Sequence, residues 1–118
     1  FANERDNKNY DIFVGGWFSD YNDPLDFLNV MKTGVYDSYG LYSNSEYDSL
    51  IDSLTGENDN AKRLEIYQKL EDLLVAQDCG VAPLYYSDKH YYYQNWVKDF
   101  YTSSFGASQE LYRATVEK

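Results

Sequence analysis

The sequence has few of the residues that form disulfides, metal sites and catalytic sites. Its 118 residues include one cysteine, one histidine and two prolines. A single cysteine, Cys79, excludes a disulfide within the chain. Its neighbours Asp78 and Gly80 include no basic group that would activate a thiolate, so we expect a buried, inert thiol at a helix end. The lone His90 has no second histidine or cysteine at ligand spacing. We therefore expect no enzyme, no cofactor and no metal site.

Basic residues are also scarce. The chain has 10 Lys and Arg against 20 Asp and Glu, which gives a net charge of −10. A chain of this charge is not expected to bind nucleic acid or the anionic surface of a membrane. No apolar run approaches the ~20 residues that span a bilayer, so we expect no direct membrane insertion by this segment.

Aromatic residues, by contrast, are abundant, with 14 tyrosines, 6 phenylalanines and 2 tryptophans. A tyrosine buries a large ring and keeps a polar end, so it suits both the edge of a core and a wet cleft. We expect most of the tyrosines to lie at the edge of a core.

The run at 15–24, G-G-W-F-S-D-Y-N-D-P, is the most informative part of the chain. It follows a predicted strand at about 9–16, and Asp23 and Pro24 predict the start of a helix that extends to about Met31. A tryptophan and a lone carboxylate, Asp20, displayed between a strand and a helix are typical of a ligand site. The alternative is a turn with a core Trp and a capping Asp. The stretch begins like a calcium loop, but Pro24 occupies a ligand position and the following Gly and terminal Glu are missing, so we do not expect calcium binding.

Hydrophobic periodicity predicts two further helices. The first has one apolar face, made of Tyr47, Leu50, Ile51 and Leu54. Ser43 and Glu46 could form its capping box, and Gly56 is a plausible stop. The second follows a polar turn at 57–60 and extends to about Asp78, with Gly80 ending it. A buried strand is predicted at 81–86, and further strand-like pieces lie at 91–93, 97–101 and 111–116. This order of elements predicts an α/β fold with helices packed on a sheet.

Five runs along the chain together carry a family resemblance. In order, they are G-W-x-x-D-Y-x-D-P-x-x-F-L at 16–28, Y-x-N-x-x-Y-D-x-L-I at 42–51, R-x-x-x-Y-x-x-x-E at 63–71, V-x-P-L-Y-Y at 81–86 and W-V-K at 96–98. The chain from about Tyr10 to its end resembles the extracytoplasmic oligopeptide-binding proteins of ABC importers, solute-binding protein family 5. Members of the family are much longer, and the likeness is to their C-terminal part. We therefore expect the chain to be a fragment of such a receptor.

The resemblance implies a two-lobed periplasmic-binding-protein-like clamshell (type II, cluster C), with helices packed on a small mixed sheet. Residues 1–88 would belong to the C-terminal lobe and carry part of the peptide groove. Residues 89–118 would cross the hinge back to the N-terminal lobe. The implied function is oligopeptide binding for ABC-transporter-mediated uptake, with membrane permease subunits as partners of the full-length protein. The implied location is extracytoplasmic, either as a cell-surface lipoprotein or in the periplasm.

The resemblance also implies a peptide site. Asp20 would hold the amino terminus of the peptide, while Trp17 and its neighbours line the groove. The backbone near Phe18 could pair with an extended peptide as an added strand. The peptide-binding residues carried over in this way are Gly16, Trp17, Phe18, Asp20, Tyr21 and Tyr85.

Two other functions stay open at this point. The same scaffold could bind another solute, such as an oligosaccharide, a metal chelate or haem, or act as a peptide-signal receptor, and the Trp and Tyr faces suit sugars as well. A tyrosine-rich structural module is the third possibility, and it predicts no cleft.

Overall fold

The computed structural model describes residues 7, 9–35, 41–103, 105 and 111–117. The chain divides into two compact units. The first unit consists of Phe1–Trp17 and Asp23–Pro83, and the second consists of Phe18–Asn22 and Leu84–Lys118.

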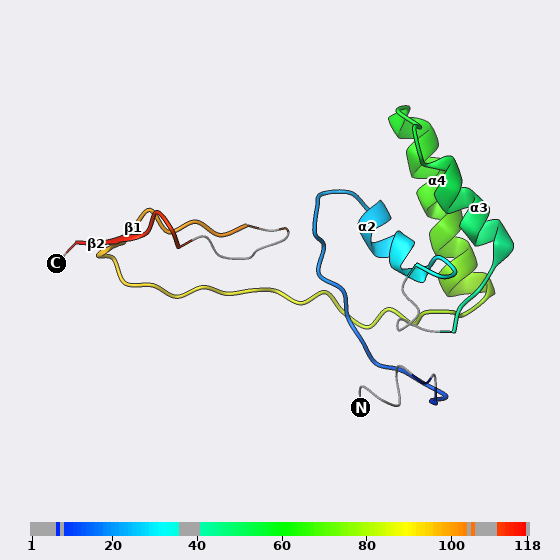
Figure 1. Cartoon of the computed structure of the whole chain (residues 1–118), viewed down its shortest axis with the longest axis horizontal. Helices are drawn as coiled ribbons and strands as arrows, with labels where there is room; N and C mark the ends of the chain where they lie inside the picture. Colours follow the sequence, from blue (N-terminus) through cyan, green and yellow to red (C-terminus); the bar gives the residue numbers. More distant parts are fainter. Residues whose placement is uncertain (1–6, 8, 36–40, 104, 106–110, 118) are drawn as a thin grey trace. The chain divides into compact units, whose positions relative to one another are not determined.

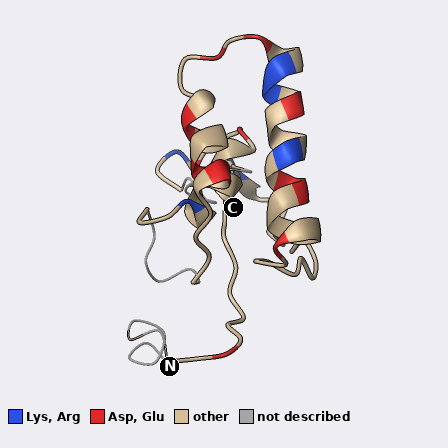
Figure 2. Ribbon diagram, turned by 90° about the vertical axis from the view of Figure 1, so that its right-hand side faces the viewer, with Lys and Arg blue, Asp and Glu red and all other residues tan. Residues whose placement is uncertain are grey.

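The first unit is helical (Figure 1). Its elements are α2 (Leu25–Leu28), the 3-10 helix η1 (Asn29–Met31), α3 (Ser45–Ser53), α4 (Asn60–Glu71) and the π-helical turn η2 (Asp72–Gln77). Helices α3 and α4 lie side by side, and α2 contacts α4. Acidic and basic residues alternate along the longest described helix, α4, which is typical of a solvent-facing helix surface (Figure 2). No helix in the described part of the chain combines the length and the apolarity that crossing a membrane requires.

The predicted helices are present, but the start of α3 differs from the prediction. Asn44, rather than Ser43, is the N-cap, and its side-chain oxygen accepts the backbone N–H groups of Glu46 (2.8 Å) and Tyr47 (3.1 Å). The capping box of Ser43 and Glu46 was therefore wrong. A carboxamide one residue later satisfies two of the N–H groups that a helix start leaves without partners.

A small apolar core lies between the helices of the first unit. Its buried members are Leu28, Tyr47, Ile51, Leu54, Leu70, Leu73 and Leu74. Tyr47 is 0% exposed, and its hydroxyl donates a hydrogen bond of 2.7 Å to the backbone carbonyl of Leu28. Burial raises the pKa of Tyr47 because it disfavours the charged phenolate. The apolar face predicted for α3 is thus the face that packs.

The end of the long helix also differs from the prediction. Cys79 is exposed and has a positive φ of 52°, whereas we expected a buried thiol. The residue after the helix takes the left-handed conformation that ends many helices, and this turns its side chain to the surface. Gly80 has a different role, because a Cβ there would come within 2.5 Å of the Tyr42 ring and 3.1 Å of Leu74. Gly80 therefore allows a close approach of the chain to the core.

The second unit contains two short strands, β1 (Val97–Lys98) and β2 (Thr115–Val116). They pair antiparallel, with Val97 opposite Val116 and Lys98 opposite Thr115. Beside them, the Phe100 ring lies 5.0 Å from that of Tyr93, between ring centroids. Within the described residues the expected mixed sheet is thus reduced to one antiparallel pair.

The strands predicted at 9–16 and 81–86 are not formed as strands. Neither stretch pairs with a strand, and Leu84 and Tyr86 are 73% and 97% exposed. A strand makes its hydrogen bonds to a neighbouring strand, so a suitable sequence forms no ladder without one. The prediction of a buried strand at 81–86 was wrong for the chain taken by itself.

Candidate functional site

The 17–23 loop leads from the extended chain at Gly16 into helix α2, and its first residue is held by that helix. The indole N–H of Trp17 donates a hydrogen bond of 2.9 Å to the carboxylate of Asp26. Asp26 is only 7% exposed, and Trp17 is half-buried. A buried carboxylate needs such partners, since leaving it without them would cost several kcal/mol. The contact therefore fixes the tryptophan on the first turn of α2.

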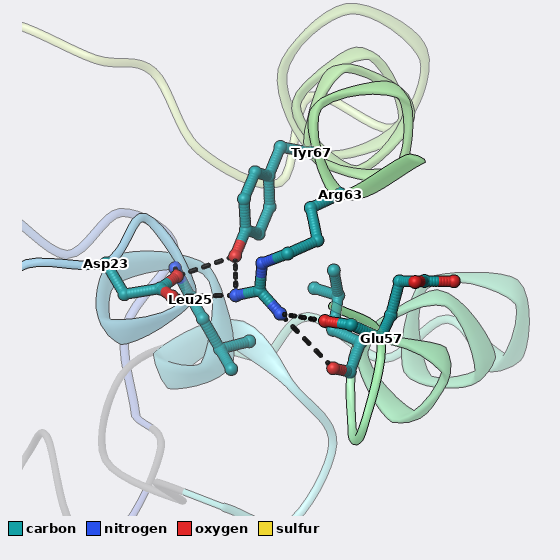
Figure 3. A network of polar contacts seen from close by, with 6 residues as sticks. Asp23, Leu25, Glu57, Arg63 and Tyr67 are labelled. Carbon is teal, nitrogen blue, oxygen red and sulfur yellow. Dashed lines mark hydrogen bonds and ion pairs between the residues drawn. The ribbon is translucent and has the colours of Figure 1, made fainter. Parts of the chain in front are cut away.

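The last residue of the loop, Asp23, is held more firmly (Figure 3). One of its oxygens accepts the backbone N–H of Leu25 at 2.9 Å, a capping contact as predicted, although Pro24 directly precedes the helix. The same oxygen accepts the hydroxyl of Tyr67 at 2.6 Å, and the other accepts the guanidinium of Arg63 at 2.7 Å. The Tyr67 hydroxyl in turn accepts a hydrogen bond from Arg63. Three side chains thus form one closed polar cluster, which we call the Asp23 cluster.

Arg63 also extends the Asp23 cluster toward the turn between α3 and α4. Its second terminal nitrogen donates to the backbone carbonyls of Leu54 (3.3 Å) and Glu57 (3.1 Å), as Figure 3 shows. A planar guanidinium can satisfy several acceptors in fixed directions, which an ammonium cannot. The start of α2 and the turn before α4 are therefore joined through one side chain.

The electrostatics of the cluster follow from these contacts. Burial acts to raise the pKa of Asp23, but the Tyr67 hydroxyl, the Leu25 N–H and the Arg63 charge outweigh it and hold the pKa below its ordinary value. Burial and the neighbouring Asp23 carboxylate raise the pKa of Tyr67 to about 12. At neutral pH the cluster therefore holds a carboxylate, a guanidinium and a neutral phenol.

Between the two held ends, the loop residues 18–22 belong to the second unit. Phe18, Asp20 and Tyr21 are exposed, and the Ser19 hydroxyl donates to the backbone carbonyl of Tyr21. The Lys89 ammonium lies 4.5 Å from the centroid of the Phe18 ring, a cation–π contact within the second unit.

The six predicted site residues are therefore distributed over both units. Gly16 and Trp17 belong to the first, whereas Phe18, Asp20, Tyr21 and Tyr85 belong to the second. A Cβ added at Gly16 would meet nothing within 4 Å, and Tyr85 is 81% exposed. The structure bonds Trp17 to α2. That all six residues form one peptide site stays a prediction.

The sequence reasoning missed three residues that hold the loop: Asp26, Arg63 and Tyr67. An acidic residue inside the apolar run Leu25–Leu28 was a signal for a buried partner. Arg63 and Tyr67 lie at i and i+4 and so share a helix face, which was a signal that they could act together. No group of three or more potential metal ligands occurs among the residues with described positions.

Comparison with known proteins shows which class of protein this chain is similar to. A search of family models finds no match. The structure is similar to that of the pheromone receptor PrgZ, solved to define its mode of peptide binding, with a TM-score of 0.78 and 28% identity. That likeness covers 99% of this chain and 22% of the receptor. In fold, the chain is a segment of a solute-binding protein.

Sequence relatives make the class more specific. The chain is 31% identical over 97 residues to the periplasmic oligopeptide-binding protein OppA of Salmonella typhimurium (strain LT2), which covers 82% of the chain and 18% of OppA. It is 34% identical over 70 residues to the probable deoxycholate-binding periplasmic protein YgiS of Escherichia coli (strain K12), covering 59% of the chain and 13% of YgiS. The chain thus spans less than a fifth of the length of the curated relatives it matches. The predicted resemblance is confirmed: the chain is homologous to a segment of the oligopeptide-binding proteins.

Proposed function

We propose that this chain is the C-terminal segment of an oligopeptide receptor that delivers peptides to an ABC importer. The observation that carries the proposal is the homology to OppA over 82% of the chain. The relatives named above are binding proteins, which supports a binding role rather than catalysis.

The 17–23 loop is the proposed peptide site. A peptide of variable sequence must be recognised through its backbone and its termini, which all peptides share. The open space at Gly16 would admit the ligand backbone, and the chain near Phe18 would pair with it as an added strand. The exposed Asp20 would then bind the α-ammonium group. Trp17, Tyr21 and Tyr85 would line a groove wide enough for water to fill mismatches.

The architecture of the whole receptor is part of the proposal. It is a two-lobed clamshell in which residues 1–88 belong to the C-terminal lobe and the chain crosses the hinge from about Lys89. The periplasmic relatives support an extracytoplasmic location, as a lipoprotein or free in the periplasm, with permease subunits as partners. Since one partial lobe offers only part of the contacts, the isolated chain should bind peptide weakly or not at all, given the ~4–15 kcal/mol cost of association.

Two observations favour related alternatives. The likeness to PrgZ supports a receptor for a peptide signal rather than for nutrient peptides. The likeness to YgiS supports a non-peptide solute. Native mass spectrometry of the purified full-length protein separates them, because co-purified mixed peptides, a single peptide and a non-peptide ligand have different masses.

Calorimetry of the full-length protein with short peptides tests the proposal. A charge-assisted hydrogen bond contributes about 1.5–3 kcal/mol, so Asp20→Asn should weaken binding of a free peptide at least ~10-fold. N-acetylated peptide should bind the wild type poorly and lose little more in the variant. Glu65→Gln, which removes one negative charge from the exposed side of α4, is the matched control. Simple additivity of Asp20→Asn and N-acetylation would remove Asp20 from the site, and absence of any peptide binding would overturn the function.

A further inference from the structure

We propose that Arg63 and Tyr67 are positioning residues for the peptide's amino terminus, acting through Asp23 on the loop that carries Asp20. The inference rests on the proposed function of the loop and names residues that no sequence motif assigns to binding. Neither side chain is argued to touch the ligand. Their part is to hold the chain from which Asp20 extends.

The loop is held at both ends by the same short helix, α2. Trp17 is bonded to Asp26 at 2.9 Å, and Asp23 caps the N–H of Leu25 at 2.9 Å. A four-residue helix such as α2 has little stability of its own, because helix nucleation is unfavourable. The anchors therefore depend on what holds α2 in place.

Helix α4 holds α2 in place. Arg63 and Tyr67 lie one helical turn apart on α4, a 12-residue helix whose Leu70 is buried in the core. Their bonds to Asp23, of 2.7 Å and 2.6 Å, span 40 and 44 residues of sequence. Both residues are partly buried, where such contacts are less screened by salt than on the open surface. The loop end is thus fixed to a stable helix.

The length of the loop limits how far Asp20 can lie from the two anchored residues. Asp20 is three residues from Trp17 and three from Asp23, so its Cα can lie at most ~11 Å from either anchor. Releasing Asp23 removes one of these two limits. The carboxylate of Asp20 would then sample a larger volume, and each ligand would have to supply the cost of ordering it.

The Asp23 cluster also affects the charges near Asp20. Arg63 pairs with the Asp23 carboxylate, which is the nearest acidic group to Asp20 along the chain. Without Arg63, the Asp23 carboxylate would keep its hydrogen bonds from Leu25 and Tyr67 but lose the positive charge beside it, so it could attract an ammonium group itself. The cluster therefore also makes recognition of the ligand's amino terminus specific to Asp20.

Tyr67→Phe in the full-length protein is the sharpest test, since it keeps the ring and the bonds of Arg63 to the Leu54 and Glu57 carbonyls. The variant loses the hydrogen bond that Tyr67 donates to Asp23 and the one that it accepts from Arg63, which should weaken binding of a free peptide by ~3–10-fold. The same variant should leave N-acetylated peptide within ~2-fold, since that ligand does not use Asp20. Arg63→Met should weaken free-peptide binding more than Tyr67→Phe does. Arg63→Lys should weaken it less than Arg63→Met does but still leave it weaker than in wild type, because an ammonium group cannot reach all the acceptors that the planar guanidinium contacts.

Two controls separate positioning from general loosening of the fold. Asp52→Asn breaks the Lys32–Asp52 ion pair, which joins the end of η1 to α3 away from the loop, and should change neither affinity. In an Asp20→Asn background, Tyr67→Phe should cause no further loss for free peptide. All affinities are compared well below the unfolding temperature of each variant.

The outcomes distinguish the inference from the function beneath it. If Asp20→Asn weakens free-peptide binding but Tyr67→Phe leaves it unchanged, the positioning role is overturned and the function stands. Equal losses for free and acetylated peptide in Tyr67→Phe would also overturn it, because they indicate a purely structural role. If Asp20→Asn itself has no effect, the proposed site fails first.

Discussion

The second unit is richer in aromatic residues for its length than the first unit, yet among the described residues only the first unit has an apolar core. Seven apolar side chains are buried together in the first unit, whereas no side chain is buried among the described residues of the second. The difference follows from where the backbone hydrogen bonds go. Helices α3 and α4 satisfy theirs internally and can bury a face against each other. Extended stretches such as 81–93 need a neighbouring strand before they can form a layer.

The largest difference between the two units is expected when one leucine in each unit is shortened to alanine. Leu70→Ala removes a fully buried side chain and should lower the free energy of unfolding of the 118-residue chain by about 2–5 kcal/mol. Leu84→Ala, at a position that is 73% exposed, should lower it by less than ~0.5 kcal/mol. Urea titration followed by helical circular dichroism measures both. A comparable loss for Leu84→Ala would show that the second unit has a core after all.

A smaller effect is expected from deleting a single hydroxyl group in each unit. Tyr47→Phe leaves the Leu28 carbonyl without its buried partner and should lower the free energy of unfolding by about 1–3 kcal/mol. Tyr86→Phe, at a 97% exposed position, is the matched control and should be neutral. The same urea titration applies. A neutral Tyr47→Phe would mean that the carbonyl finds another donor, and the contrast between the units would weaken.

The smallest effect is expected in how the free energy of unfolding changes at acidic pH, where the Asp23 cluster contributes. The pKa of Asp23 is lowered in the folded chain, so the folded state binds this proton less tightly than the unfolded state does. The resulting stability is fully present above the ordinary pKa of 3.8 and is lost as the pH falls through the lowered value. For a partly exposed pair we expect no more than ~1 kcal/mol.

Comparing the urea midpoints of wild type and Asp23→Asn at pH 7 and at a series of lower pH values measures this contribution to stability. The difference between the two proteins should shrink as the pH falls, because the wild-type carboxylate then takes up a proton. A difference that stays constant with pH would show that Asp23 acts only as a helix cap.

Features that depend on neighbours in sequence could be predicted without the structure. Helix α3 follows from the spacing of Tyr47, Ile51 and Leu54, and the structure confirms that this face is buried. The loop motif at 16–24 and the resemblance to oligopeptide-binding proteins were also recognisable, and the comparisons confirm that resemblance. These predictions succeed because helical periodicity and short motifs are local properties.

Features that join distant parts of the chain were decided only by tertiary structure. The bonds from Arg63 and Tyr67 to Asp23 span 40 and 44 residues, and no local pattern pairs these groups. The exposure of Cys79 depends on how the chain turns after its helix, and the missing strand at 81–86 depends on partners that the described residues do not supply. Sequence alone determined which segments are helical and which family they resemble, because those properties arise from neighbouring residues. Packing decided which side chains hold the loop, because a hydrogen bond between remote residues exists only once the helices that carry them have met.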